Sequence, residues 1–277
     1  MVTANASQNA AVITLETKEL FFLAGILGSD RLLGIDDPFR GYLSEEIAEE
    51  WESAKNSLLS KGYLTQVNNG VELEMSPQVF SQVAIAGLAE RACWVRYTND
   101  EESFEGYLHV TDEKVVEVRK NADSSPEYQL LEIGNVRQAS EVLVNRMKWN
   151  PKSPENMPAL LLSRKQFNEL YENSGQLSVD EISTELAEST DDHEGALALA
   201  RSIKTRISDG ELQLSVWSGT DWETQGAAFI VNESMNWLIR MSTKDDEDWL
   251  IATPTTREQF HTMLLLWLER PSEAEER

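Results

Sequence analysis

The chain has 277 residues and a formal net charge of −24 at pH 7, from 48 acidic and 24 basic side chains. A field of this sign repels phosphate backbones and anionic lipid surfaces, so general binding to nucleic acid or to membranes is not expected. The length suits one large domain or two ordinary ones, and an apolar fraction of 41% is enough for a core.

The cysteine content and the N-terminal segment limit the class of protein further. Cys93 is the only cysteine, which excludes an internal disulfide and a cysteine-rich metal site, and its apolar neighbours favour a small buried side chain. The first twenty residues have no basic segment followed by an apolar one, and no apolar run approaches the ~18 residues that cross a bilayer. The sequence therefore predicts a cytoplasmic protein in which residues 1–14 form a loose N-terminus.

The region 15–92 has the pattern of three helices and one hairpin. A helix is predicted over residues 17–28, and an amphipathic helix begins with Ser44 as its N-cap. Two asparagines and a glycine at 68–70 predict a tight turn between two short strands. A serine followed by proline at 76–77 then predicts the start of a third helix.

The order helix, helix, hairpin also occurs in winged-helix domains, so a DNA-binding regulator with a sensory sheet domain is an alternative. The second helix would then lie in the major groove, where lysine and arginine are needed to meet the phosphates. Its charged positions are mainly acidic: Glu45, Glu46, Glu49, Glu50 and Glu52, against Lys55 and Lys61. This charge balance predicts no binding to nucleic acid.

From Cys93 onward the hydrophobic period changes from helical to strand-like. Residues 93–150 predict four strands and a helix, which form a first half of a sheet. Residues 151–209 predict a proline-marked linker and further helices, and residues 210–270 again predict four strands and a helix. Residues 271–277 form an acidic tail.

The two strand-rich segments match at an offset of 120 residues, as between Gly106 and Gly226. The other pairs at this offset are Val110 with Ile230, Leu130 with Leu250, Leu131 with Ile251, Leu143 with Met263, Val144 with Leu264 and Met147 with Trp267. Arg119 matches Arg240 better, at an offset of 121 residues. A turn that is one residue longer in the second segment explains this difference.

Capping boxes are predicted at matching places before the last helix of each segment, from Asn135 to Gln138 and from Thr255 to Glu258. We therefore predict an α+β fold with a pseudo-twofold repeat of antiparallel strand–strand–strand–strand–helix units. These units form a central sheet, and additional helices lie at the N-terminus and in the middle of the chain.

Residues with catalytic or metal-binding chemistry do not form a recognisable pattern. His109, His193 and His261 stand far apart in the sequence and have no histidine or cysteine at ligand spacing. The chain has no phosphate-binding glycine loop and no nucleophile elbow. We therefore predict no enzymatic activity, no cofactor and no metal site; a small-molecule-binding or enzymatic α+β domain is the alternative that this pattern disfavours.

The order of elements resembles the EspG family, the cytosolic chaperones of type VII (ESX) secretion. The most similar pieces are "LLLSRKQFNELYE" leading to "HEGALALARSIKTRI", and the ending "WLIATPTTREQFHTMLLLWL". The resemblance covers roughly residues 15–270. It implies a quasi-twofold α+β fold and a protein that binds the helical tip of a secretion substrate, keeps it soluble and delivers it for export. Mycobacterial members serve PE–PPE pairs and are rich in alanine, arginine and glycine, so this acidic chain resembles a divergent member.

The resemblance also implies where a partner binds, because EspG-type proteins engage cargo partly through a loop in the first half and nearby helices. We expect the contact at the turn between the first two strands, with Trp222 in the equivalent turn of the second half, and basic residues on the cargo tip. The residues nominated in the first turn are Asn99, Asp100, Glu101, Glu102 and Phe104. The identity of the cargo and the oligomeric state stay open.

Overall fold

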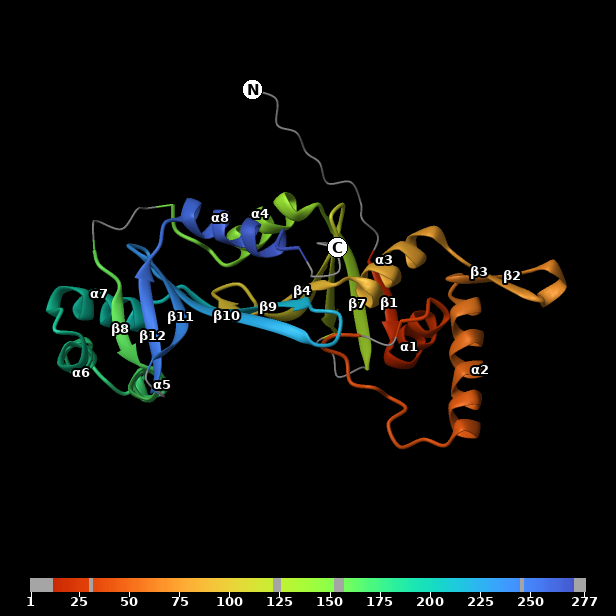
Figure 1. Ribbon diagram of the computed structural model, residues 1–277, viewed down its shortest axis with the longest axis horizontal. Coiled ribbons are helices and arrows are strands. Elements are labelled where there is room, and N and C mark those ends of the chain that lie inside the picture. Colours follow the sequence, from red (N-terminus) through yellow and green to blue (C-terminus); the bar gives the residue numbers. More distant parts are fainter. Residues whose placement is uncertain (1–11, 30–31, 122–125, 152–156, 245–246, 272–277) are drawn as a thin grey trace, which may run out of the picture.

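The computed structural model describes residues 12–29, 32–121, 126–151, 157–244 and 247–271. One ten-stranded antiparallel sheet runs through these residues, in the order β1-β7-β6-β5-β4-β9-β10-β11-β12-β8 (Figure 1). Helices cover both faces of the sheet, so the protein has the predicted α+β class.

The strands of the main sheet are β1 (Ile13–Glu16), β4 (Arg91–Asn99), β5 (Ser103–Val110), β6 (Val115–Lys120), β7 (Glu127–Gly134), β8 (Leu160–Ser163), β9 (Ser208–Trp217), β10 (Trp222–Val231), β11 (Asn236–Lys244) and β12 (Glu247–Pro254). A separate hairpin consists of β2 (Leu64–Val67) and β3 (Glu72–Met75). The helices are α1 (Thr17–Ile26), α2 (Ser44–Ser60), α3 (Pro77–Leu88), α4 (Val136–Arg146), α5 (Arg164–Asn173), α6 (Val179–Thr190), α7 (His193–Lys204) and α8 (Arg257–Leu268).

An N-terminal lobe forms from α1, α2, α3 and the β2–β3 hairpin, which projects from the body at the far right of Figure 1. Its core contains a buried carboxylate, Glu19, which accepts hydrogen bonds from Ser57 Oγ and Lys61 Nζ, both at 2.7 Å. Residues 13 and 14 differ from the prediction of a loose terminus, because they belong to β1 and pair with β7. The apolar Ile13 side chain is buried there, which explains the ordered strand.

Most of the turns and helix caps predicted for this lobe are confirmed. Asn68 and Asn69 adopt left-handed φ values of 52° and 56° in the predicted tight turn, and Ser76 is the N-cap of α3. The N-cap of α2 was predicted at Ser44, one residue too late. Leu43 is its N-cap, and the Glu46 carboxylate accepts a hydrogen bond from the Leu43 N–H at 2.7 Å.

A second lobe of α5, α6 and α7 packs on the far end of the sheet, over β8, β11 and β12. Trp237 of β11 is fully buried in it, and its Nε1 donates a hydrogen bond to Ser202 Oγ of α7 at 3.0 Å. Ser178 caps α6 by accepting a hydrogen bond from the Glu181 N–H. This lobe lies at the lower left of Figure 1, away from the N-terminal lobe.

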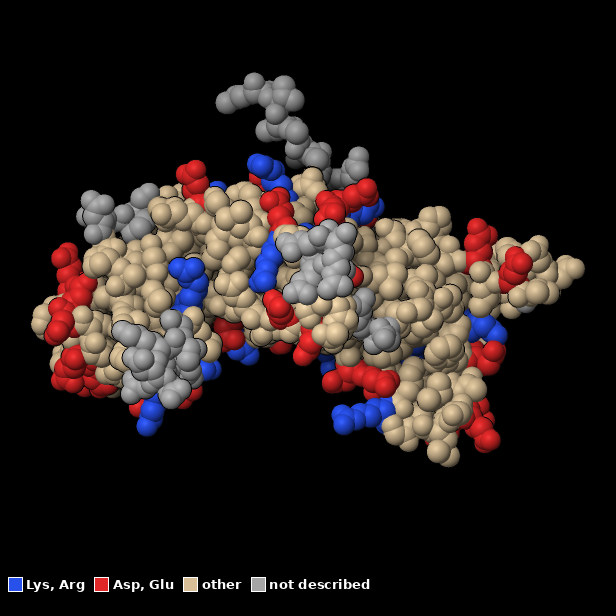
Figure 2. Space-filling view, in the orientation of Figure 1, with Lys and Arg blue, Asp and Glu red and all other residues tan. Residues whose placement is uncertain are grey.

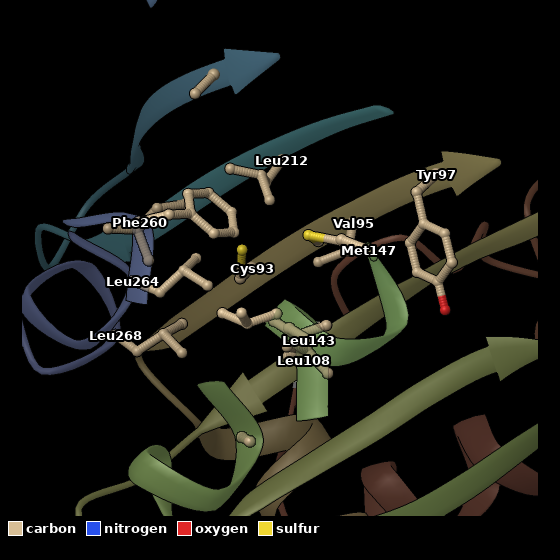
Figure 3. Packing of buried hydrophobic residues seen from close by; sticks show 14 of the residues in the cluster. Cys93, Val95, Tyr97, Leu108, Leu143, Met147, Leu212, Phe260, Leu264 and Leu268 are labelled. Atoms are coloured by element: carbon tan, nitrogen blue, oxygen red, sulfur yellow. The ribbon is translucent and has the colours of Figure 1, made fainter. Parts of the chain in front are cut away.

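The other face of the sheet is covered by α4 and α8, which lie side by side above the central strands (Figure 1). Figure 3 shows their apolar side chains directed at the strands, for example Leu143 of α4 and Leu264 of α8. Trp149 stacks on Phe260 with ring centroids 3.7 Å apart. Cys93 is fully buried in this core, as predicted, and burial raises the pKa of its thiol to about 12.

The two strand-rich segments meet where β4 pairs with β9 at the centre of the sheet. The same element order, four antiparallel strands and then a helix, occurs from β4 to α4 and from β9 to α8. The two segments therefore form one continuous sheet. That they superpose about a twofold axis stays a prediction.

The predicted offset of 120 residues is wrong for the strands beside this junction. Val110 belongs to the core beneath α4 and α8, whereas Ile230 belongs to the core of the second lobe, on the opposite face. Val231, one residue further, lies in the same core as Val110. Side chains alternate along a strand, so an error of one residue reverses the face of every matched pair.

The alignment of α4 with α8, the last helix of each segment, has the same error of one residue. Asn135 and Gln138 form the predicted capping box of α4, but α8 is capped by Thr256 and Gln259 rather than by Thr255 and Glu258. The buried residues follow the corrected alignment. Leu143 of α4 and Met147, which directly follows α4, correspond to Leu264 and Leu268 of α8, not to Met263 and Trp267.

Candidate partner-binding surface

The turn between β4 and β5 is organised by Asn99. Its Oδ1 accepts hydrogen bonds from the backbone N–H of Glu101 and of Glu102, both at 2.8 Å. Its Nδ2 donates to the carbonyl oxygen of Arg146, at the end of α4, at 2.8 Å. Asn99 therefore sets the shape of the turn and ties it to α4, so its side chain serves the fold.

The acids of this turn are exposed and form its outer surface. Glu101 makes an ion pair with Lys148, and Glu102 accepts a hydrogen bond of 2.5 Å from the Tyr97 hydroxyl. Burial, and then the hydrogen bond to Glu102, raise the pKa of Tyr97. With Asp100, the turn presents a negative surface that Lys148 neutralises only in part.

Phe104 does not extend this surface, because its side chain is buried at 5% exposure. Its ring stacks on Tyr97 with centroids 5.2 Å apart, and the Arg146 guanidinium lies 5.7 Å from the ring centroid. The structure thus places Phe104 in the core beneath the turn. The exposed aromatic contact that the sequence analysis expected at this position is not present in the unbound chain.

Trp222 lies far from the β4–β5 turn. It packs edge-to-face against Trp217, with ring centroids 5.4 Å apart, where β9 turns into β10. Since β4 and β9 are antiparallel, this turn is beside Arg91, at the opposite end of β4 from Asn99. Nine residues of β4 at roughly 3.3 Å each separate the two turns by about 25–30 Å, so they form no common surface.

A second candidate surface lies on the face of the sheet opposite α4 and α8. There the two lobes lie over the two ends of the sheet (Figure 1) and leave a hollow between them over the middle strands (Figure 2). We call this uncovered area the open face. It consists of Trp94, Arg96, Glu105, Glu211, Gln213, Gly226 and Met241.

Aromatic and charged side chains are fixed against one another on the open face. Arg96 makes an ion pair of 3.1 Å with Glu211, and its guanidinium lies 5.4 Å from the ring of Trp94. The Trp94 indole N–H in turn points to Glu105 Oε1 at 3.3 Å. Both partners of the ion pair are about half exposed, so it adds little to stability. Its effect is to orient Trp94 on the surface.

Three adjoining hollows make the open face a groove. One of about 580 Å³ lies between β5 and residues 33–35, and one of about 380 Å³ lies beside Tyr171 of α5. A third, of about 350 Å³, lies between Trp94 and the start of α5. The first two share Arg96, and the last two share Glu211, so the hollows are neighbours along the open face.

Sequence reasoning did not find this groove, although a partial signal exists. Polar residues alternate with apolar ones in the central strands, as at Arg96 and Thr98 in β4 and at Glu211 and Gln213 in β9. This alternation indicates strands with one exposed face. It does not tell which part of that face the two lobes leave uncovered.

Neither a cluster of metal-ligating side chains nor a membrane-spanning helix occurs among the described residues. Within this part of the chain, no group of three or more histidine, cysteine, aspartate or glutamate side chains could hold a metal ion. Among the helices of these residues, none combines the length and the apolar character needed to span a bilayer. The exposed aromatic, polar and charged groups of the open face are suited to contact with another protein.

Comparison with known proteins gives one clear result. No family model and no curated protein matches the sequence. The fold, however, matches the solved structure of the Mycobacterium tuberculosis type VII secretion system chaperone EspG5, in complex with a PE25-PPE41 dimer, with a TM-score of 0.61. The match covers 94% of this chain and 96% of that chain, at 9% sequence identity. The chain has an EspG-like fold. The α+β fold implied by the family resemblance is thus confirmed, while its quasi-twofold repeat stays a prediction.

In this EspG-like fold the two candidate surfaces adjoin. Thr98 and Ser103, whose hydroxyls lie 3.3 Å apart, flank the acidic turn and also line the hollow beside Tyr171. The acids at 100–102 therefore border one end of the groove, whereas Trp222 lies at the other end of the strands.

Proposed function

We propose that this protein is a cytoplasmic chaperone or adaptor that binds a helical secretion substrate and keeps it soluble for export, without catalytic turnover. The observation that carries the proposal is an EspG-like fold over 94% of the chain, whose central strands are uncovered between two lobes. We place the partner on the open face, bordered by the acidic β4–β5 turn.

The dimensions of the groove support a helical partner. Its floor extends from β5 across β4, β9 and β10 to β11. Neighbouring strands lie ~4.8 Å apart, so the floor is about 19 Å wide. Two packed helices with axes about 8–10 Å apart, each about 10–12 Å in diameter, have a similar width. The floor therefore suits the tip of a two-helix partner.

The chemistry of the groove supports a partner with apolar and basic residues. Trp94 is half-buried and Met241 is 59% exposed, which makes both available for contact, whereas Gly34 covers the ring of Tyr107. Aromatic side chains of this kind contribute most of the binding energy in many protein interfaces. The net charge of −24 and the acids at 100–102 favour approach of a basic surface.

The test is co-expression with helical-hairpin proteins encoded beside its gene, followed by size-exclusion chromatography and measurement of affinity. We expect a soluble complex with at least one of them, and a cargo that aggregates when expressed alone. Trp94→Ala should weaken binding by about 2 kcal/mol or more, roughly thirtyfold.

Two exposed apolar residues provide a matched control. Met241, on the open face, is 59% exposed, and Leu266, on α8, is 67% exposed. Met241→Ala should weaken the complex, whereas Leu266→Ala should leave its affinity unchanged. Absence of any complex with these helical proteins would contradict the proposed function. A complex that tolerates both Trp94→Ala and Met241→Ala would contradict the open face as its site.

A further inference from the structure

We propose that the hollow above Gly226 is an anchor pocket that receives one large apolar side chain from the tip of the helical partner. This inference rests on the proposed function and specifies the chemistry of its cargo. It also makes Gly226 a specificity-determining residue, because the missing side chain creates the space.

Neither the backbone conformation nor a close contact among the described residues requires a glycine at position 226. The pairing of β10 with β9 is continuous from Trp222 to Val231, so no bulge is present there. Its φ is not in the left-handed region, and a Cβ added to it would meet only Leu212 O, at 3.6 Å, which is an ordinary contact. Glycine weakens a strand, and in a regular strand it often marks close approach of a ligand or another chain.

Two other strand glycines show the contrast. A Cβ at Gly210 would lie 2.2 Å from Arg96 O, and one at Gly106 would lie 2.9 Å from Val118 O. Close packing within the chain therefore accounts for both of them. It does not account for Gly226, which is exposed on the open face.

The surroundings of Gly226 form an apolar pocket with a polar rim. Trp94, Met241 and Leu250 supply apolar walls to the hollow of about 350 Å³. Arg164 and Glu211, of opposite charge, stand among its lining residues. Since these charges balance, the pocket favours an uncharged apolar side chain over an acidic or a basic one. An apolar centre inside a polar rim is the usual arrangement of an interface anchor.

The experiment uses a phage-displayed library of two-helix hairpins with randomised tip residues, selected against the full-length protein. We expect the selected tips to carry a leucine, isoleucine, methionine, phenylalanine or tryptophan at one position. Their affinity is then measured for Gly226→Ala, Gly226→Val and Gly226→Leu, whose side chains fill the pocket progressively. We expect a graded loss that reaches about tenfold or more with leucine.

The control is Gln225→Leu, which adds an apolar side chain at the neighbouring exposed position, on the other face of β10. It should bind the selected hairpins like the wild type. The thermal midpoint of every variant tests whether the fold is retained. Gly226→Ala adds only a Cβ in ordinary contact, so it is expected to fold even if Gly226→Leu does not.

Each outcome has a distinct meaning. Selected tips without a preferred apolar residue, or equal affinity for all three Gly226 variants, would overturn the anchor pocket and leave the proposed function in place. Hairpins that bind equally well after Trp94→Ala and Met241→Ala would show that they bind outside the open face. Failure of the wild type to select any hairpin would count against the proposed function itself.

Discussion

Arg146 donates a hydrogen bond of 2.5 Å from Nη1 to Oε2 of Glu117, whose carboxylate is only 1% exposed. Burial by itself would lower the pKa of Arg146, but attraction to Glu117 and the hydrogen bond outweigh it and raise this pKa. Oε1 of Glu117 has no hydrogen-bond partner among the residues that the structure describes. The buried carboxylate of β6 therefore depends on the last residue of α4 for its neutralisation.

Removing one partner of this pair should destabilise the protein more than removing both. Arg146→Met leaves an uncompensated buried charge and should lower the free energy of unfolding by about 3–5 kcal/mol. The double variant Arg146→Met/Glu117→Leu should recover most of that loss. Urea denaturation of the two single variants and the double variant measures this coupling, and additive losses would contradict it.

Phe104 is predicted to affect stability rather than partner contact. Its buried ring packs on Tyr97, so Phe104→Ala should lower the free energy of unfolding by about 3–5 kcal/mol. Phe104→Leu keeps most of the apolar volume and should cost much less. Thermal denaturation distinguishes the two; a Phe104→Ala protein as stable as the wild type would mean that the ring is not part of the core.

The acidic turn tests the electrostatic part of the proposed interface. Replacing Asp100 and Glu101 by lysine should weaken binding of a basic cargo tip by about tenfold, or 1.4 kcal/mol, at low salt. The effect should shrink as salt screens the charges. Asp221→Lys, in the equivalent but distant β9–β10 turn, is the control. Equal affinities for the two variants and the wild type would exclude the first turn from the interface.

His109 should make stability depend on pH. It is 3% exposed, and burial lowers its pKa from the ordinary 6.5 to about 4. The unfolded chain therefore takes up a proton as the pH falls below about 6.5, while the folded chain does not. Its contribution is present in full above that pH and is lost as the pH falls toward 4. Between pH 7 and pH 5 the loss should be about 2 kcal/mol.

His109→Gln is the comparison for this effect, because it removes the titration and keeps a polar side chain. Urea denaturation at several pH values should show a shallower decline for the variant than for the wild type. Parallel declines would mean that the carboxylates alone account for the acid sensitivity.

The protein should not bind random duplex DNA at physiological salt. The N-terminal lobe has the element order of a winged helix, yet its second helix exposes Glu45, Glu46, Glu49 and Glu52. These charges oppose the phosphates and the release of counterions. Fluorescence anisotropy with a labelled duplex measures this; a micromolar affinity that falls steeply with salt would support a regulator instead.

The sequence by itself determined the α+β class, the order of elements and most local signals. The capping box at Asn135 and the turn at Asn68 depend on residues a few positions apart, so their patterns are visible in the sequence. The α+β class implied by the EspG resemblance was correct because it rests on the same order of strands and helices.

Only the tertiary structure decided which faces are covered. Val110 and Ile230 look equivalent in the sequence, but side chains alternate with a period of two, and an error of one residue puts them on opposite faces of the sheet. Phe104 looks like an exposed turn residue until α4 and Tyr97 enclose it. Trp94 looks like a core residue, yet it stays accessible because the two lobes leave the central strands uncovered. Coverage depends on contacts between segments distant in sequence, and no local pattern encodes them.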